Sequence, residues 1–363
     1  METVLVGLSG GVDSSVAALL LKQAGYDVIG VTMSIWRKRD DITTTCSHGG
    51  CYGPDEEEDI KDAECAAEKI GIPYYVFDCA DEYEKIVLDN FKQEYISGRT
   101  PNPCIRCNAS VKFGVLPYLA KKHGIMFDKF ATGHYARVEK DTDSKFTLKS
   151  ALSANKDQSY FLYRLKQKTL SSVILPLGIK TKDEIRAIAK SYGLKAADKP
   201  DSQDFYGGNY NELLKIPAKR GNIVNMDGKI LGEHNGIWNY TIGQRRGLCV
   251  SAPKPLYVLE LRPETNEVVA GYADETFKKA LYADDISLVK EDLELFEHII
   301  NTKRITAKTR STQKPVNVRV YLDNDIRIRV EFDDLQKSIT PGQSVVLYDN
   351  EIVLGGGIIN EIE

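Results

Sequence analysis

The sequence predicts an α/β protein with a parallel-sheet domain over residues 1–205, a small central domain over residues 206–275 and a C-terminal β-barrel over residues 276–363. Up to about residue 200, strands alternate with amphipathic helices, a pattern typical of a parallel sheet covered by helices on both faces. After about residue 275, short alternating strands separated by turns indicate a small barrel. Between these regions the alternation of strands and helices stops, and this change of pattern predicts the central domain.

The elements of the first domain follow from apolar strand segments that alternate with helical periodicity. The first strand is the apolar run at residues 4–6, and Thr181 is expected to cap the last helix. Further strands are expected at residues 28–32, 74–78 and 129–132, and helices at residues 16–21, 59–70, 82–95, 112–123, 159–165 and 182–192. Ligands bind at the C-terminal ends of such strands, where the loop after residue 6 and the segment 131–135 are expected to lie.

The rest of the chain has the turn chemistry of antiparallel strands. Asp227-Gly228 predicts the turn of a hairpin over residues 222–232. In the tail, strands are expected at residues 316–322, 327–332 and 344–348, with turns at Asp323-Asn324-Asp325 and Asp349-Asn350.

The composition is that of an ordinary globular chain, with 42% hydrophobic and 28% charged residues among 363. A formal net charge of −4 exerts no general attraction on nucleic acid, so such a partner would need a local basic face. No apolar run is long enough to cross a bilayer and no secretory signal is evident, so we expect a cytoplasmic protein without a membrane partner. Seven cysteines, an odd number, indicate reactive thiols or metal ligands rather than a disulfide framework.

The first loop, Gly7-Leu8-Ser9-Gly10-Gly11-Val12-Asp13-Ser14-Ser15, connects the first strand to the first helix. A helix N-terminus after a turn of small residues offers free backbone N–H groups to an anion, and glycines let the main chain approach phosphate oxygens. The loop lacks the Gly-Lys-Ser/Thr ending that holds a γ-phosphate for transfer. Asp13 and the missing lysine favour a site that binds pyrophosphate with Mg²⁺ nearby, as adenylation requires. The alternative is an ordinary strand-to-helix turn.

The second motif is a Cys-x-x-Cys pair, Cys104 and Cys107, in a proline-stiffened loop just before a predicted helix. The helix dipole and the charge of Arg106 are expected to lower the thiol pKa and raise the thiolate fraction. Such an environment suits a nucleophilic or sulfur-carrying cysteine. Two alternatives stay open, a structural zinc site completed by Cys46 and Cys51, and inert packing.

Five motifs occur in one order along the chain: residues 8–15, 98–108, 131–135 and 155–162, and Asn239-Tyr240-Thr241-Ile242-Gly243-Gln244-Arg245-Arg246-Gly247. Pro341-Gly342-Gln343-Ser344 and residues 354–357 accompany them in the tail. With these motifs the chain resembles the bacterial tRNA-specific 2-thiouridylases over essentially its whole length. The resemblance implies an ATP-pyrophosphatase domain of the adenine nucleotide α-hydrolase type, a central tRNA-contacting domain and a final barrel.

The resemblance also implies an activity: ATP adenylates the 2-oxygen of the wobble uridine of tRNA, and sulfur from a cysteine persulfide then replaces that oxygen. It implies Mg²⁺ beside ATP, and a sulfur-donor protein, a cysteine desulfurase or a relay, as partner. Cys107 falls at the nucleophile, and Asp13 would serve adenylation. The target base would be framed by Asn102, Pro103 and Cys104. ATP would be held by Gly7, Leu8, Ser9, Gly10, Gly11, Val12, Asp13, Ser14, Gly133 and, against the adenine, Met33. The tRNA would touch His134, Lys156, Asp157, Gln158, Arg310, Ser311 and Gln343.

One departure from the family concerns the sulfur chemistry. The family has a second catalytic cysteine a few residues after Asp-Ser-Gln, whereas this chain has Asp201-Ser202-Gln203-Asp204-Phe205-Tyr206, with Tyr206 nearest the missing position. Cys104 is the expected substitute, because the Cys-x-x-Cys spacing allows a disulfide with Cys107 after transfer. Cys249 is a weaker candidate. The other hypotheses are an iron–sulfur cluster on Cys104, Cys107 and a third cysteine, and an altered reaction.

A second departure lies in the barrel, where Arg310-Ser311-Thr312-Gln313 replaces the family's Arg-Tyr-Arg-Gln. Basic barrel residues, among them Lys308 and Arg310, are candidates for contacts with tRNA phosphates or for an ordinary solvated face. Two rival functions stay open: an adenylating enzyme of the same class with another substrate, and a tRNA- or metal-binding paralogue with altered sulfur chemistry.

Overall fold

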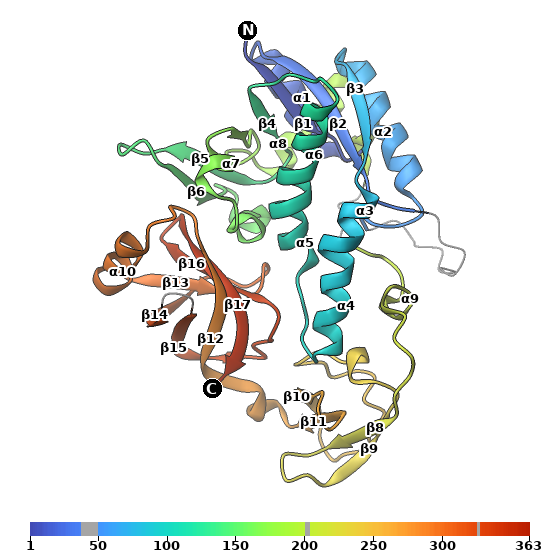
Figure 1. Ribbon diagram of the computed structural model, residues 1–363, viewed down its shortest axis with the longest axis vertical. Coiled ribbons are helices and arrows are strands. Elements are labelled where there is room, and N and C mark those ends of the chain that lie inside the picture. The colour runs from blue at the N-terminus through green and yellow to red at the C-terminus, as the bar shows by residue number, and fades with distance from the viewer. Residues whose placement is uncertain (38–49, 200–203, 325–326) are drawn as a thin grey trace.

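The computed structural model describes residues 1–37, 50–199, 204–324 and 327–363, and its N-terminal part is a parallel sheet (Figure 1). The strand order is β3-β2-β1-β4-β7, and each neighbouring pair is parallel. The strands are β1 (Thr3–Gly7), β2 (Asp27–Ser34), β3 (Tyr74–Asp78), β4 (Lys129–Ala131) and β7 (Val173–Ile174). The predicted parallel sheet is therefore confirmed.

Helices cover both faces of this sheet because its strands are apolar on both sides. Val4 and Val6 of β1 face a core shared with α1 (Val12–Gln23), α2 (Glu56–Ile70) and α8 (Lys182–Tyr192). Leu5, between them, faces the opposite core, to which the helical segments after β3 contribute. Thr181 caps α8 as predicted: its hydroxyl accepts the Glu184 N–H, and the Glu184 carboxylate accepts the Thr181 N–H.

Two continuous helical runs occupy the second face. The first comprises α3 (Ala80–Tyr83), the π-helical η1 (Glu84–Leu88) and α4 (Asp89–Ile96). The second comprises α5 (Pro103–Arg106), the π-helical η2 (Cys107–Val115) and α6 (Leu116–Lys122). This second run starts nine residues earlier than the predicted 112–123, because Asn102 acts as the N-cap and Pro103 occupies the first turn. Cys104 and Cys107 therefore lie within the helix and not in a loop before it.

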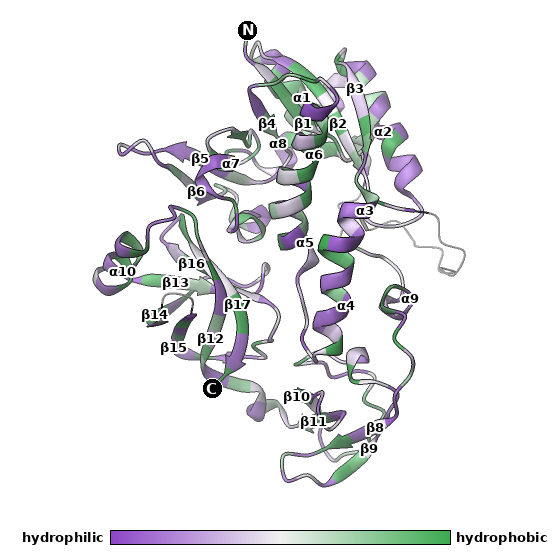
Figure 2. Ribbon diagram, in the orientation of Figure 1, coloured by the Kyte–Doolittle hydropathy of each residue, from purple (hydrophilic) through white to green (hydrophobic). Residues whose placement is uncertain are grey.

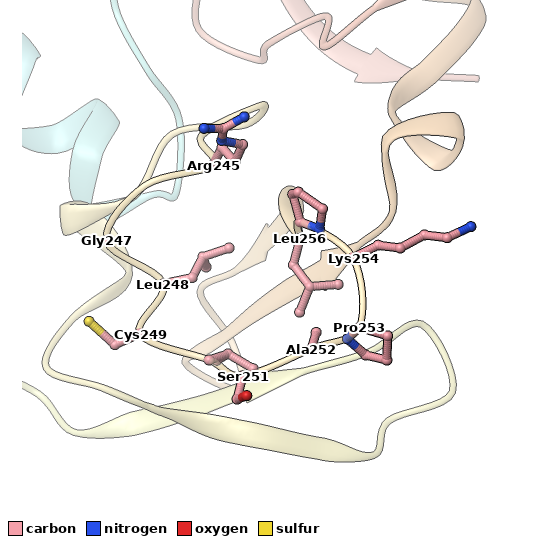
Figure 3. Close-up of a pocket in the computed structure, with 11 residues that line it drawn as sticks. Arg245, Gly247, Leu248, Cys249, Ser251, Ala252, Pro253, Lys254 and Leu256 are labelled. Carbon is pink, nitrogen blue, oxygen red and sulfur yellow. The ribbon is translucent and has the colours of Figure 1, made fainter.

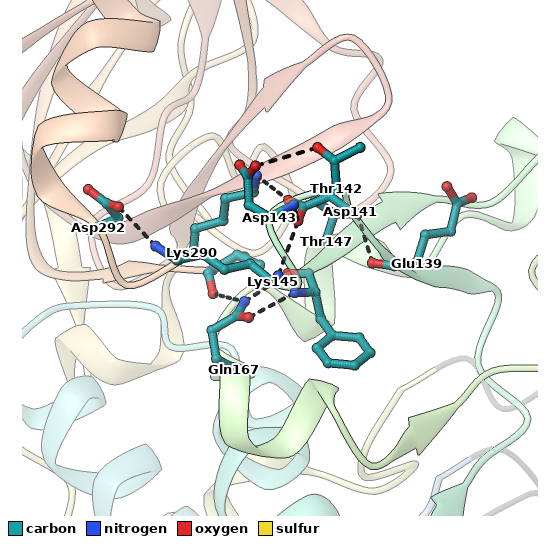
Figure 4. Close-up of polar contacts among 11 residues, drawn as sticks. Glu139, Asp141, Thr142, Asp143, Lys145, Thr147, Gln167, Lys290 and Asp292 are labelled. Atoms are coloured by element: carbon teal, nitrogen blue, oxygen red, sulfur yellow. Dashed lines mark hydrogen bonds and ion pairs between the residues drawn. The ribbon is translucent and has the colours of Figure 1, made fainter.

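A hairpin that the sequence analysis missed follows β4. It consists of β5 (Ala136–Lys140) and β6 (Phe146–Ser150), and β6 pairs with the barrel strand β17 at Lys149 and Ile352. Polar contacts also join the hairpin to the barrel, as Figure 4 shows: Lys145 Nζ lies 2.9 Å from Asp292 Oδ2, and Lys290 Nζ lies 2.5 Å from Asp141 Oδ2. The helix expected at residues 159–165 is only a 3₁₀ turn, η4 (Ser159–Leu162).

The central domain is a four-stranded sheet in the order β10-β11-β8-β9, with α9 (Tyr210–Leu214) before it. Its predicted hairpin is formed by β8 (Gly221–Val224) and β9 (Ile230–His234), followed by β10 (Tyr257–Arg262) and β11 (Glu267–Gly271). The predicted barrel is confirmed, since β12 pairs with both β15 and β17 and thereby closes the sheet. Its strands are β12 (Phe277–Leu288), β13 (Ile305–Lys308), β14 (Val316–Asn324), β15 (Arg327–Lys337), β16 (Ser344–Asp349) and β17 (Ile352–Ile362), with α10 (Leu293–Thr302) against β14.

Hydrophobic and hydrophilic residues alternate in bands along the barrel strands and α4, as Figure 2 shows, which is typical of elements with one buried face. Within the described ranges, no helix combines the length and the hydropathy needed to cross a membrane.

A buried ion pair joins the segment after β6 to the barrel. Lys308, predicted as part of a basic face, is instead almost fully buried, and its Nζ lies 3.6 Å from Asp157 Oδ2. Asp157 Oδ1 also accepts the backbone N–H groups of Ala151 and Ser159. The prediction of a solvated Lys308 is wrong because the segment 151–159 folds over it.

We expect Asp157→Ala to lower the free energy of unfolding by about 3–5 kcal/mol, because it leaves the Lys308 ammonium buried without its counter-charge. Urea unfolding followed by circular dichroism measures the change. The matched control is Glu233→Ala, which breaks the exposed pair with Arg220 and should cost less than about 1 kcal/mol. Equal losses in the two variants would contradict the assignment.

Candidate active site

The loop between β1 and α1 has the geometry of an anion site. Gly11 is the N-cap of α1, with no side-chain hydrogen bond to the free N–H groups of the first turn. Ser14 Oγ accepts the Ser9 N–H at 3.1 Å and donates to the Gly11 carbonyl at 3.2 Å, which holds the loop closed on itself. Gly10 has φ +71°, and a Cβ there would lie 2.3 Å from the Asp59 carbonyl oxygen. The loop can therefore present backbone N–H groups to a phosphate, and Gly10 is required by its conformation.

Gly133, at the end of β4, closes one side of this loop. A Cβ at Gly133 would lie 2.7 Å from the Ser14 nitrogen and from the carbonyl carbon of Asp13. Any side chain at position 133 would push the two segments apart. Met33 lies on the adjacent strand β2, half-buried. The residues that the resemblance assigns to ATP thus lie along one edge of the sheet.

Asp13, in the first turn of α1 directly after this loop, has two partners that the sequence analysis missed. Lys182 Nζ lies 2.8 and 2.9 Å from the two Asp13 carboxylate oxygens, and the Tyr135 hydroxyl donates to Oδ1 at 2.7 Å. The Lys182 side chain is 10% exposed and that of Asp13 30%. No local signal marks Lys182 because it lies 169 residues from Asp13 and reads only as the first residue of a helix. The one hint in the sequence is Asp13 itself, because an acidic side chain beside a phosphate site calls for a positive charge nearby.

Of the two cysteines of the helical run, Cys107 is buried and Cys104 is partly buried, and this overturns one prediction. Cys107 is only 6% exposed, and burial raises its thiol pKa to about 12. Burial also raises the pKa of Cys104, where Cys51 and Cys107 add to the effect. The predicted lowering by Arg106 and the helix dipole is wrong, because removal of the thiolate from water outweighs both. Lys112, five residues along the same π-helical segment, is the charge that lowers the pKa of both thiols.

We expect the buried thiols to be nearly inert in the protein alone. At pH 7.5, iodoacetamide should modify the exposed Cys249 at least about 100-fold faster than Cys107, because only an accessible thiolate reacts. Time-quenched alkylation with peptide mass spectrometry measures both rates in one sample. Urea-unfolded protein is the control, since burial no longer protects Cys107 there. Equal native rates would show that Cys107 is not shielded.

Several of the residues expected to touch tRNA make hydrogen bonds within the protein. Gln343 Nε2 donates to the Thr100 carbonyl at 2.8 Å and thereby joins the barrel to the loop before Asn102. Gln158 Oε1 accepts the Tyr135 N–H, beside Lys156 and the buried Asp157. The Arg310 guanidinium donates to Ser338 O and Thr340 Oγ1, next to Ser311.

His134 connects the nucleotide loop to the cysteine helix. It directly follows Gly133, and its Nδ1 lies 2.7 Å from Thr132 Oγ1. Its ring centroid lies 5.9 Å from that of Phe113, on the π-helical segment that begins at Cys107. Burial holds the pKa of His134 well below its usual value, and Lys112 lowers it further, so this imidazole is neutral at physiological pH. The segment that closes the nucleotide loop is thus in contact with the helical run that carries Cys107.

Metal ligands are absent around the cysteines in the described part of the chain. No group of three or more His, Cys, Asp or Glu side chains there could hold a metal ion. Cys46, one of the two cysteines expected to complete a zinc site, lies outside the described residues, as do Asp201, Ser202 and Gln203.

Cys249 lies elsewhere, beside an open cavity of about 680 Å³ in the central domain (Figure 3). The loop around that cavity also carries Arg245 and Lys254, both exposed. The loop therefore forms a basic surface. None of the described contacts brings the Cys249 thiol to Cys107.

A parallel sheet with an open phosphate loop, an acidic residue in that loop and no P-loop lysine defines a nucleotide-binding domain of the adenylating, ATP-pyrophosphatase class. Three family models match the chain: the tRNA methyl transferase HUP domain at residues 2–206, the tRNA methyl transferase PRC-barrel domain at 213–272 and the aminomethyltransferase beta-barrel domain at 278–359. The chain belongs to the family of the tRNA-specific 2-thiouridylases MnmA, as its motifs predicted.

The relatives cover the whole length. The MnmA of Endomicrobium trichonymphae is 50% identical over 99% of this chain and 100% of its own length. The MnmA of Acetivibrio thermocellus is 44% identical over 99% of both chains. Among solved structures, a 4-thiouridine synthetase in complex with RNA and ATP is 16% identical with a TM-score of 0.35, covering 60% of this chain and 46% of its own.

Proposed function

We propose that this chain is an ATP-dependent sulfurtransferase that converts the wobble uridine of tRNA to 2-thiouridine. The observation that carries the proposal is the continuity of the site. Gly133 abuts the nucleotide loop, and the next residue, His134, contacts the helical segment that begins at Cys107. An activated base held between the loop and this helix would lie near both the nucleotide and the thiol.

In the first step, the free N–H groups of α1 bind the phosphates of ATP. The uridine 2-oxygen attacks the α-phosphorus, an O–P bond forms, and pyrophosphate leaves. Asp13 fits a Mg²⁺ ion, because its carboxylate lies in the loop and is partly exposed. The ion would supply positive charge to the phosphates. Lys182 would then be released from Asp13 as a second positive charge in the same loop.

In the second step, a sulfur-donor protein, a cysteine desulfurase or a relay, transfers a sulfur atom to Cys107 as a persulfide. The terminal sulfur attacks carbon 2 of the adenylated base, a C–S bond forms, and AMP leaves with the oxygen. The base is then linked to Cys107 through a disulfide-type bond, which a second thiol must break. The sequence predicts Cys104 for that step, in addition to its place with Asn102 and Pro103 beside the target base.

An iron–sulfur cluster fits the described residues less well. Cys104 and Cys107 have no third ligand within the described ranges that could complete a metal site. We therefore derive no step through a cluster.

Because the chain has a net charge of −4, it does not attract the tRNA phosphates as a whole, and tRNA would bind to local basic surfaces. The exposed Arg245, Arg246 and Lys254 of the central domain provide one such surface. His134, Lys156, Asp157, Gln158, Arg310, Ser311 and Gln343 remain proposed contacts, as the family resemblance implies. The proposal implies a cytoplasmic location, where tRNA is modified.

The test uses the purified chain with ATP, unmodified tRNA and a persulfide donor. We expect tRNA-dependent pyrophosphate release and 2-thiouridine in the digested tRNA, measured by nucleoside mass spectrometry. Pyrophosphate release that does not require tRNA would favour an adenylating enzyme with another substrate. Binding of tRNA without either product would favour a binding paralogue.

A further inference from the structure

The segment around Cys51 lies against the segment where the family's second catalytic cysteine is missing. The Tyr52 N–H donates to the Phe205 carbonyl at 2.8 Å, and Gly50 forms a parallel bridge with Asp204. A Cβ on Gly50 would lie 2.8 Å from the Phe205 carbonyl oxygen and 3.0 Å from Tyr206 Cα. Cys51 is therefore held beside position 206 by contacts on both of its sides, although 155 residues separate the two in sequence.

Tyr206 itself cannot supply the chemistry of a thiol. Its ring is buried, 6.3 Å from that of Tyr52, and its hydroxyl donates to Glu212 at 3.0 Å. Its phenol is part of an aromatic cluster, so this position has a structural role here.

The thiols of Cys51, Cys104 and Cys107 all influence one buried phenol, that of Tyr83. Tyr83 is stacked on Tyr52 with ring centroids 5.3 Å apart, and its pKa is raised by burial and then by Cys51, Cys107 and Cys104. Cys51 also raises the pKa of Cys107 and of Cys104, so the three thiols are close enough to influence one another.

Helix geometry disfavours Cys104 as the thiol that forms a disulfide with Cys107. Both residues belong to one continuous helical run, three positions apart. Side chains at that spacing have Cβ atoms about 5–6 Å apart, whereas a disulfide needs about 3.5–4.5 Å. The first turn would have to deform to bring the two Cβ atoms within that range. Cys51 belongs to a separate segment before α2, so its approach to Cys107 leaves the helix intact.

Lys112 provides the charge for the exchange. Cys51 is exposed as a residue. Desolvation of its thiol raises the pKa, and the largest opposing influence is the Lys112 ammonium, which lowers the pKa of all three thiols. A thiolate formed at Cys51 or Cys107 is therefore stabilised by the same cation. Asp204 and Asp59 oppose this effect at Cys51, and each carboxylate has another partner: Tyr210 for Asp204 and Lys199 for Asp59.

From the contacts of Gly50 and Tyr52 with the segment 204–206, we propose that Cys51 is the second thiol of the reaction and releases the thiolated base from Cys107. This rests on the proposed function. The Cys51 thiolate attacks the Cys107 Sγ atom, and the bond from Cys107 to the base-bound sulfur breaks. The electron pair leaves with the 2-thiouridine sulfur. A Cys51–Cys107 disulfide remains, and an external dithiol must reduce it by two electrons before the next cycle.

The experiment is a single turnover of enzyme carrying persulfide on Cys107, with ATP and tRNA and without reductant. The wild type should release 2-thiouridine and form a Cys51–Cys107 disulfide, identified by non-reducing peptide mass spectrometry. In Cys51→Ser, release should fall at least about 30-fold and a covalent enzyme–tRNA adduct should accumulate. Dithiothreitol should free 2-thiouridine from that adduct, which shows that the variant is folded and that earlier steps are intact.

Cys65→Ser and Cys79→Ser are the matched controls, because neither thiol belongs to the proposed site, and both should release product within about threefold of the wild type. Normal release by Cys51→Ser, or a Cys104–Cys107 disulfide in the wild type, would overturn the proposal. Iron and sulfide bound to active enzyme and lost in Cys51→Ser would overturn it in favour of a cluster. Absence of tRNA-dependent pyrophosphate release in the wild type would instead overturn the proposed function itself.

Discussion

Cys107→Ser should abolish 2-thiouridine formation, a loss of at least about 1,000-fold, and should leave tRNA-dependent pyrophosphate release within about threefold of the wild type. A serine hydroxyl cannot carry a transferable sulfur atom, so the reaction stops after the base is adenylated. The nucleotide loop lies on other elements, β1 and α1, and does not depend on the thiol. Nucleoside mass spectrometry and a pyrophosphate assay on the same sample measure the two steps separately.

Cys79→Ser is the matched control, because Cys79 is another buried thiol near this helix, and burial raises its pKa to about 12 as well. Its replacement should preserve both products. Full sulfur incorporation by Cys107→Ser would refute the nucleophile assignment. Equal losses of pyrophosphate and 2-thiouridine would indicate a structural defect.

Asp13→Asn should reduce pyrophosphate release by at least about 100-fold, because it removes the negative charge that fits Mg²⁺ and weakens the attraction that holds Lys182 at this position. The substitution keeps the size of the side chain and an oxygen for the Tyr135 hydroxyl. 2-Thiouridine formation should fall by the same factor, since sulfur can attack only an adenylated base.

Asp27→Asn is the control for Asp13→Asn, because Asp27 is an exposed carboxylate at the start of β2, the opposite end of the strand from the loop. Its activity should not change. The result would contradict our assignment if Asp13→Asn released pyrophosphate at the wild-type rate. Thermal unfolding of both variants shows whether the loss of the Lys182 partner affects folding.

The nucleotide loop and the barrel could be predicted from sequence because their signals are local. Residues 7–15 are consecutive, and the hydrogen bonds of Ser14 with Ser9 and Gly11 join near neighbours in sequence. The Thr181 cap of α8 depends on Glu184, only three residues away. The first half of the barrel strand β15 alternates with a period of two, which requires no knowledge of its partners.

The helix that carries the cysteines shows where local reasoning fails. The start of this helix has a local signal, because Asn102 is the N-cap and Pro103 occupies the first turn. Proline is also common in loops, and the prediction treated these residues as a loop. The pKa of the Cys107 thiol has no local signal in the sequence, because it depends on how far the surrounding protein excludes water from that thiol. Lys308 was predicted on a wet face for the same reason, since alternation along β13 does not show that residues 151–159 cover it.

The amino-acid sequence alone predicted the parallel sheet, the barrel and the phosphate loop, because each follows from residue types at short spacings. The family resemblance of its ordered motifs added the family and Cys107 as the candidate nucleophile. Tertiary structure decided which distant groups meet: Lys182 with Asp13, Lys308 with Asp157, and Cys51 with the segment at Tyr206. Such pairings depend on how strands and helices far apart in the chain come together, and the energies of buried charges and thiols depend on the water that this packing excludes.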